Sequence, residues 1–329
     1  MRRTSKAPFG LYGKKVRTLL FENGIEWIMH NQVFDFAIAI DDIIYDWNFI
    51  QLLEQAAQRI GLTTYLIMPN NLKETIQKLQ AEQIDFKFYY DRASDTSPEF
   101  LDVYDWVTQK NIPILDTIAT LKRAADKATM HLEFIANGIV TPYTIIIPPV
   151  SKTEDISPSI VDLSNLGRPF IIKPANTTGG GRGVVKGAET LQDILQARIQ
   201  YHNDKYLLQE KIVPLEHGGK RFWFRGFYAC GAVECAWWND LTHVYEPLTE
   251  ESVKIYQLDQ LFSIVKKIAD ICNLNFFSTE IAINQKREFV VIDYVNEICD
   301  MRLQSQHADG VPDEIVHNIT QSIAAYVKG

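Results

Sequence analysis

The sequence is poor in cysteine, and its four cysteines form no motif. They are widely spaced and include no C-x-x-C pair, so they do not supply a disulfide framework for a chain of 329 residues. We expect reduced cysteines that are buried as small apolar side chains, and therefore a cytoplasmic protein. These cysteines are Cys230, Cys235, Cys272 and Cys299.

Long apolar runs and an excess of positive charge are missing too. The run Ile145–Val150 is too short to span a bilayer and contains two prolines. Lys and Arg together number 33, against 41 Asp and Glu, which gives a net charge of −8. An acidic chain offers no general electrostatic footprint for nucleic acid or for an anionic membrane, so we expect neither as a partner. A hydrophobic content of 46% excludes a disordered chain.

The first third of the chain alternates apolar runs with segments of helical spacing. This alternation predicts an N-terminal α/β domain over residues 1–116, with a parallel sheet covered by helices. The expected strands are Phe34–Ile40, Thr63–Met68, Phe86–Tyr90 and Ile112–Asp116, and the expected helices are Asp46–Gly61, Asn70–Gln83 and Ser97–Asn111.

From residue 117 the pattern changes to hairpins flanked by helices, which predicts an α+β domain over residues 117–329. The expected helices are Thr117–Gly138, Leu191–Tyr201, Glu250–Leu274 and Pro312–Val327. The expected strands are Thr141–Ile147, Phe170–Lys173, Gly183–Lys186, Tyr206–Ile212, Phe222–Ala229, Ala232–Trp238, Ser278–Ile283 and Glu288–Val295.

A cluster of glycines follows the strand that ends in Lys173. Glycine lets backbone N–H groups approach phosphate oxygens, and nearby lysine and threonine side chains add a positive charge and hydroxyl donors. The alternative is a glycine-rich hairpin turn with a solvated Lys173. The segment matches neither the P-loop nor G-x-G-x-x-G, so a nucleotide here requires another fold. The loop residues are Thr177, Thr178, Gly179, Gly180, Gly181 and Gly183.

Oxygen-bearing side chains lie on the predicted hairpin near the C-terminus. Glu280, Asp293 and Asn296 make a set that suits Mg²⁺ when phosphate oxygens complete its coordination. If Ile283 pairs with Phe289 in a regular ladder, Glu280 and Asp293 point to opposite faces, so a bulge or a shift is required. The alternative is two acids on a solvated face.

These features in this order resemble the ATP-grasp superfamily: a lysine-bearing strand, a glycine loop, a strand with Gln-Glu, and a hairpin with acids and Asn. The resemblance covers residues 117–329. It implies an ATP-grasp domain in which two subdomains, about 117–203 and about 204–329, clamp the nucleotide. It also implies ATP and Mg²⁺ as cofactors.

The resemblance also assigns roles to individual residues. Lys127 and Lys173 would contact the nucleotide, the Thr177–Gly183 loop would close over its phosphates, and Arg225 would stabilise the transferring phosphate. Lys127 alone also fits an exposed helix lysine. Adenine and ribose would be held by Gln209, Glu210, the backbone of Lys211 and Ile212, and Glu216; the magnesium ligands would be Glu280, Asp293 and Asn296.

The sequence departs from the family in one segment. The family's second metal strand usually ends in Glu-x-Asn, often with Pro-Gly shortly afterwards. Here the sequence is Asp293-Tyr294-Val295-Asn296-Glu297, in which the spacing between acid and Asn is one residue longer, and no Pro-Gly follows. Glu297 is therefore an alternative ligand, and the subfamily is not identified.

Most ATP-grasp enzymes join a carboxylate to an amine or thiol through an acyl-phosphate and release ADP and phosphate. The resemblance implies this ligase activity on small-molecule substrates. Two alternatives stay open: a small-molecule kinase on the same scaffold, and a nucleotide-binding protein without ligase chemistry. Related ligases often form homodimers, which makes a homodimer one expected state.

Three further residues are candidates for substrate binding. Arg302 and Ser305 follow the metal strand and suit a substrate carboxylate, or belong to a solvated loop. Asp41 follows the first clear strand, where it would meet a cationic amine or cap the next helix. His243 and His307 are expected on the surface, and the alternative is that they are polar residues of the pocket.

Overall fold

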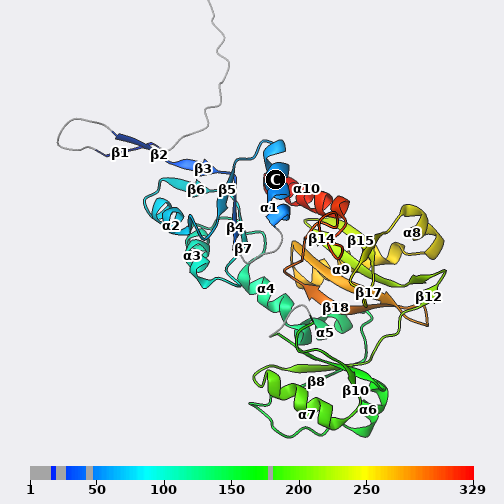
Figure 1. Cartoon of the computed structure of the whole chain (residues 1–329). Helices are drawn as coiled ribbons and strands as arrows, with labels where there is room; N and C mark the ends of the chain where they lie inside the picture. The colour runs from blue at the N-terminus through cyan, green and yellow to red at the C-terminus, as the bar shows by residue number, and fades with distance from the viewer. Residues whose placement is uncertain (1–15, 20–26, 42–46, 177–180) are drawn as a thin grey trace, which may run out of the picture. The chain divides into compact units, whose positions relative to one another are not determined.

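The computed structural model describes residues 16–19, 27–41, 47–176 and 181–329 (Figure 1). They form two compact units. The first consists of the described residues within Met1–Asp42 and Leu62–Pro113, and the second of those within Ile43–Gly61 and Ile114–Gly329. Within the described ranges, no helix combines the length and the apolar character that crossing a membrane requires.

The first unit contains the expected parallel sheet. Strand β4 (Phe36–Ile40) is wholly buried and pairs in parallel with β5 (Thr64–Ile67) and β7 (Tyr89–Arg92). The remaining elements are the parallel pair β3 (Gln32–Phe34) and β6 (Ile84–Phe86), the antiparallel pair β1 (Val16–Leu19) and β2 (Trp27–His30), the 3₁₀ turn Pro98–Phe100, and helices α2 (Leu72–Gln80) and α3 (Leu101–Gln109).

The predicted strand at Ile112–Asp116 is wrong. Pro113 has no N–H, and its carbonyl accepts a bond of 2.9 Å from Tyr89 N. Asp116 turns its carboxylate to the backbone N–H groups of Asn275 and Phe276, at 2.7 and 3.1 Å. This segment is therefore a loop rather than a fourth strand.

The second unit contains a four-stranded antiparallel sheet that carries Lys173. Its order is β10 (Val185–Ala188), β9 (Phe170–Pro174), β11 (Tyr206–Gln209) and β8 (Thr144–Ile147). Helices α6 (Ile160–Leu166) and α7 (Leu191–Gln200) bury apolar side chains against one face of it (Figure 1). Leu207 on β11 belongs to the other core of the unit, because successive side chains of a strand point to opposite faces.

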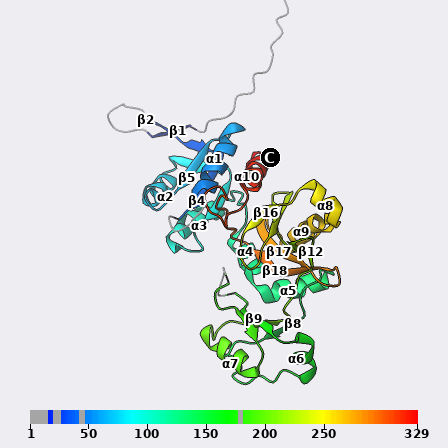
Figure 2. The same ribbon diagram turned by 45° about the vertical axis from the view of Figure 1, so that its right-hand side comes forward.

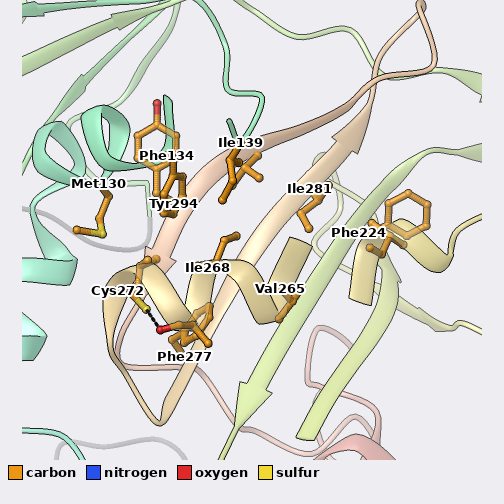
Figure 3. Close-up of a cluster of buried hydrophobic side chains, with 14 of the residues drawn as sticks. Met130, Phe134, Ile139, Phe224, Val265, Ile268, Cys272, Phe277, Ile281 and Tyr294 are labelled. Carbon is orange, nitrogen blue, oxygen red and sulfur yellow. Dashed lines mark hydrogen bonds between the residues drawn. The ribbon is translucent and has the colours of Figure 1, made fainter. Parts of the chain in front are cut away.

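The second sheet of this unit has five antiparallel strands. Its order is β16 (Tyr245–Pro247), β15 (Ala232–Trp238), β14 (Trp223–Ala229), β17 (Phe276–Ile283) and β18 (Phe289–Asn296). Helix α9 (Asp259–Cys272) covers one face, as Figure 2 shows. The helix comes so close to β14 that a Cβ on Gly226 would lie 2.4 Å from Val265 Cγ2. Figure 3 shows this core, which includes Val265, Phe277 and Tyr294.

The other elements of the second unit are helices α1 (Trp47–Arg59), α8 (Glu250–Tyr256) and α10 (Asp313–Lys328) and the short pair β12 (Glu216–His217) and β13 (Lys220–Arg221). Helix α1 belongs to this unit although it lies within residues 1–116 of the chain; its Phe49 ring stacks on Phe276 at 5.9 Å. The boundaries at residues 116 and 203 remain predictions.

Two of the predicted helices are each two helices. The segment Thr117–Gly138 forms α4 (Ile118–Ala125) and α5 (Lys127–Ala136), because Asp126 adopts an extended conformation and caps α5 by accepting from Ala128 N at 3.1 Å. The segment Glu250–Leu274 divides after α8, where Gln257 takes the left-handed conformation with φ 57°. The first break places Lys127 at the N-terminus of α5.

Candidate functional site

The site begins with a bulge in the hairpin of β17 and β18. Ile283 pairs with Phe289 and the ladder is regular as far as Ile281, but Glu280 then lies opposite Asp293, one residue further along. Residues directly opposite each other in an antiparallel pair share a face of the sheet. The extra residue of the bulge therefore brings the two carboxylates to one face, as the sequence requires for a shared site.

A second shift in the same hairpin places Asn296 opposite Ser278. Tyr294 and Val295, between the two shifts, are both buried in the core. The structure thus accommodates the longer Asp-x-x-Asn spacing, and the side chains of Glu280, Asp293 and Asn296 are all only partly exposed.

Glu280 is held by two side chains of β14. Arg225 Nη1 donates to its Oε1, and Trp223 Nε1 donates to its Oε2 at 3.2 Å. The guanidinium of Arg225 also lies 5.4 Å from the centre of the Trp238 ring, and its buried Nε has no hydrogen-bond partner among the residues that the structure describes. Burial raises the pKa of Glu280, because an ionised carboxylate loses hydration in the interior.

Lys173 approaches this pair from the other sheet. Its side chain is 7% exposed, and Nζ donates to Ile292 O at 3.1 Å. Burial lowers the pKa of Lys173 to about 8, against the opposing influence of the Asp293 carboxylate. Burial alone would raise the pKa of Asp293, but neighbouring positive charges outweigh it and lower this pKa. The positive charges are those of Lys173, Lys127 and Arg225.

The donor set fits a magnesium ion that shares its coordination with phosphate. Two carboxylates and an amide supply hard oxygen ligands, and Mg²⁺ is usually held by one or two carboxylates with substrate phosphates and water. Within the part of the chain that the structure describes, no three His, Cys, Asp or Glu side chains form a metal cluster of their own. These residues therefore suit a metal that arrives with a nucleotide rather than a closed structural site.

Part of the glycine loop lies outside the described residues, namely Thr177, Thr178, Gly179 and Gly180. Gly181 and Gly183 are described, with φ of 74° and 75°. A Cβ on Gly183 would lie 2.7 Å from Tyr201 Cε2. Glycine is therefore required at Gly183 by both backbone conformation and packing.

Three of the five residues expected around adenine and ribose have hydrogen-bond partners in the chain. Gln209 is buried and donates through Nε2 to Tyr294 Oη at 2.6 Å. Glu210 Oε2 accepts from Tyr143 N at 3.2 Å, and Glu216 accepts from Arg221 Nη1 at 2.6 Å. Lys211 and Ile212 follow the end of β11 and belong to no strand. The nucleotide roles of these five residues remain predictions.

The substrate candidates are tied to their own surroundings. Arg302 donates to the carboxylates of Asp300 and Asp309, at 2.7 and 2.9 Å from Nη2. The backbone N–H of Ser305 donates to Asp313 Oδ1 at 3.0 Å. Binding of a substrate carboxylate by Arg302 would require exchange of one of these acids.

Asp41 lies in the first unit and is buried there. Its Oδ2 accepts from Thr96 Oγ1 at 3.2 Å and from Ser97 Oγ. These bonds tie it to the loop that precedes Pro98, and its alternative role as a cap of the next helix remains a prediction. Its expected contact with a cationic amine remains a prediction.

Tyr294 and the contact of Trp223 with Glu280 were not predicted from the sequence. Trp223 is two residues before Arg225, so the period of a strand places both on one face, and this spacing was a usable signal. Tyr294 gave no signal, because its partners His131 and Gln209 are distant in the sequence.

His131 gives a prediction for stability against pH. Burial and the positive charge of Lys173 lower its pKa from 6.5 to about 4. Between these values the unfolded chain binds a proton that the folded chain excludes, so His131 makes stability fall as the pH falls from 6.5 to 4. We expect this contribution to reach about 2 kcal/mol at pH 5 relative to pH 7.

The measurement is urea unfolding of wild type and His131→Gln at both pH values. The variant should lose less stability on acidification than the wild type does. His202→Gln, at an exposed position, is the matched control and should behave as the wild type. Equal acid sensitivity of wild type and His131→Gln would contradict the prediction.

Of the comparisons with known proteins, the one with solved structures found similar proteins. No protein-family model matches the sequence, and no curated protein matches it. Among solved structures, the RimK-domain ATP-grasp protein of Sphaerobacter thermophilus DSM 20745 is 19% identical over 89% of this chain and 99% of that chain, with a TM-score of 0.60.

Two further structures are similar. The D-alanine–D-alanine ligase of Bacillus anthracis, complexed with ATP, is 13% identical over 89% of this chain and 96% of that one, with a TM-score of 0.58. The macrocyclase MdnB of Microcystis aeruginosa MRC is 15% identical over 90% and 99%, with a TM-score of 0.55. At these identities the likeness lies in the fold, and this chain is therefore a protein with the ATP-grasp fold.

Proposed function

We propose that the protein is an ATP-dependent ligase that joins a carboxylate to an amine or thiol through an acyl-phosphate, with Mg²⁺ as cofactor. One observation carries the proposal: three basic side chains and two carboxylates, from five separate elements, come together around Asp293. These are Lys127, Lys173, Arg225, Glu280 and Asp293. Such a set supplies both the metal ligands and the positive charges that phosphoryl transfer needs.

The fold neighbours support the same chemistry. They include the D-alanine–D-alanine ligase with ATP and the ligase PsnB, complexed with a minimal precursor, Mg and ADP. The neighbours are 19% identical or less, so the substrates of this chain stay open. Small-molecule carboxylates and amines, including amino acids and peptides, are the classes to test.

In the proposed reaction the substrate carboxylate attacks the γ-phosphorus of ATP, and ADP leaves. The amine or thiol then attacks the carbonyl of the acyl-phosphate, loses a proton, and releases phosphate. Lys173 and Lys127 would neutralise phosphate oxygens, and Arg225 would stabilise the transferring group. Glu280, Asp293 and Asn296 would hold the magnesium ion, which supplies Lewis-acid stabilisation of the phosphate charge.

Arg225 is prepared for this role by its surroundings. Its Nη1 is bonded to Glu280, whereas its buried Nε has no partner in the described part of the chain. A buried N–H without a partner costs free energy, and a substrate oxygen would satisfy it. No nucleophilic side chain is required, because the nucleophiles belong to the substrates.

The proposal is tested by release of ADP. Purified protein is incubated with ATP, Mg²⁺ and paired carboxylate and amine libraries, and ADP, free phosphate and the acceptor mass are measured together. A ligase releases equal amounts of ADP and phosphate with a condensed product. Phosphate retained on the acceptor would show a kinase instead. If the protein bound no nucleotide at all, both the ligase and the kinase would be contradicted.

A cytoplasmic location and a homodimer remain predictions.

A further inference from the structure

Tyr294 is completely buried one residue after Asp293, and its hydroxyl bonds directly to side chains of two other elements. Gln209 Nε2 on β11 donates to Tyr294 Oη at 2.6 Å. Tyr294 Oη lies 2.6 Å from His131 Nδ1 on α5. Gln209 Nε2 also donates to Thr144 Oγ1 on β8, at 3.0 Å. A single phenol therefore links β18 to α5, β11 and, through Gln209, β8.

The donor and the acceptor in each of these hydrogen bonds follow from the chemical groups involved. The amide of Gln209 can only donate through Nε2, so the oxygen of Tyr294 accepts there and its hydrogen is free to bind His131. His131 accepts only when it is neutral, and its pKa, lowered to about 4, keeps it neutral at physiological pH. The chain of bonds is thus satisfied from end to end, which gives such a buried network one preferred arrangement.

The same ring contacts the lysine of the site. Lys173 Nζ lies 5.1 Å from the centre of the Tyr294 ring and bonds Ile292 O, two residues before Tyr294. A cation over an aromatic face is attracted by the electrons of the ring. Tyr294 thereby touches the side chain that would meet the phosphates, while its neighbour Asp293 would meet the metal.

The elements that Tyr294 connects carry the residues of the proposed nucleotide site. Lys127 is on α5 with His131, Lys173 is on β9, which pairs with β11, and Asp293 is on β18. The four-stranded sheet and the five-stranded sheet both contribute, so the site works only if the two keep their relative arrangement. Gln209 and Tyr294 form a side-chain bond between the two sheets.

From this geometry we infer that Tyr294, with Gln209, is a positioning residue that holds the two subdomains in the arrangement that binds ATP. The inference rests on the proposed function and adds to it a role for Gln209 different from direct contact with adenine. The opposing explanation is that Tyr294 only fills the core, in which case loss of its hydroxyl would lower stability without a specific effect on nucleotide binding.

The test replaces Tyr294 by phenylalanine, which removes the hydroxyl and keeps the ring over Lys173. Affinity for the non-hydrolysable analogue AMPPNP with Mg²⁺ is measured by calorimetry. We expect the Kd to rise by roughly threefold to tenfold, because loss of a buried hydrogen bond lowers the fraction of molecules in the binding arrangement. Gln209→Leu removes the same bond from its other end and should have a similar effect.

Tyr206→Phe is the matched control. Tyr206 is also completely buried on β11, but its hydroxyl donates to Ala197 O at 2.7 Å within the four-stranded sheet and its helices. We expect its Kd to stay within about twofold of the wild type, although it loses a buried bond of similar strength. The double variant Tyr294→Phe with Gln209→Leu should raise the Kd by less than the product of the two single effects, because the bond between these side chains is already lost in either single variant.

Hydrogen exchange of the nucleotide-free protein gives a second readout. Tyr294→Phe should speed exchange in α5, β11 and β18 together, whereas Tyr206→Phe should do so only around β11 and α7. Equal Kd values for the Tyr294 and Tyr206 variants, without the coupled change in exchange, would overturn the inference. A wild-type protein that binds no AMPPNP would instead overturn the proposed function. The exchange pattern would still test whether Tyr294 couples α5, β11 and β18.

Discussion

The Lys173→Met variant is expected to lose ATP turnover by roughly a hundredfold or more while its fold is retained. Lys173 is buried, and its ammonium lies where positive charge lowers the pKa of Asp293. Methionine fills much the same volume without charge, so the variant loses the electrostatic stabilisation of phosphate together with the bond to Ile292 O and the cation–π contact with Tyr294. Methionine also removes the cost of burying a charge, which favours the folded state.

The measurement pairs AMPPNP affinity with ADP release in the presence of the acceptor that the library screen identifies. The fold is checked by thermal unfolding. Lys186→Met on β10 provides the control, since Lys186 is an exposed lysine of the same sheet. Turnover by Lys173→Met at the wild-type rate would remove Lys173 from the proposed site and with it the main argument for a nucleotide there.

Sequence periodicity predicted the secondary structure of this chain well where a segment is either fully buried or buried along one face. The fully buried strand β4 and the amphipathic helix α3 are examples, and the ATP-grasp fold inferred from the order of the motifs is confirmed. The prediction errors occur where a single polar side chain determines where a helix or a strand ends. Asp126 interrupts a continuous helical pattern by capping a new helix, and Asp116 ends a predicted strand by accepting two distant N–H groups.

The candidate site was predictable in its residues but not in its geometry. The sequence required a bulge between Glu280 and Asp293, and the structure has one. The partners of Gln209 and Arg302 were not predictable, because side-chain bonds to Tyr294 and Asp309 depend on how separate elements pack. The residue types indicated that Gln209 and Arg302 form polar contacts, but only the structure identifies their partners.

Glu280→Gln is expected to reduce ATP turnover by roughly a hundredfold while the protein remains folded. Glutamine keeps the size of the side chain and an oxygen for Arg225, but it removes a negative charge from the proposed magnesium site. The Mg²⁺ concentration required for AMPPNP binding should therefore rise, and this titration is the specific measurement. Glu234→Gln is the matched control, because Glu234 is a half-buried carboxylate of the same sheet that binds Asn318 Nδ2 at 3.0 Å.

Glu280→Ala is expected to behave differently from Glu280→Gln. Alanine would leave the buried guanidinium of Arg225 without its carboxylate, and breaking such a pair costs about 3–5 kcal/mol of folding free energy. The alanine variant should therefore lose both turnover and stability, and urea unfolding would separate the two losses. If Glu280→Gln and Glu280→Ala were equally stable, Arg225 would not depend on Glu280 for its burial. If Glu280→Gln kept wild-type turnover and Mg²⁺ dependence, the metal site would have to be sought at Asp293 with Glu297.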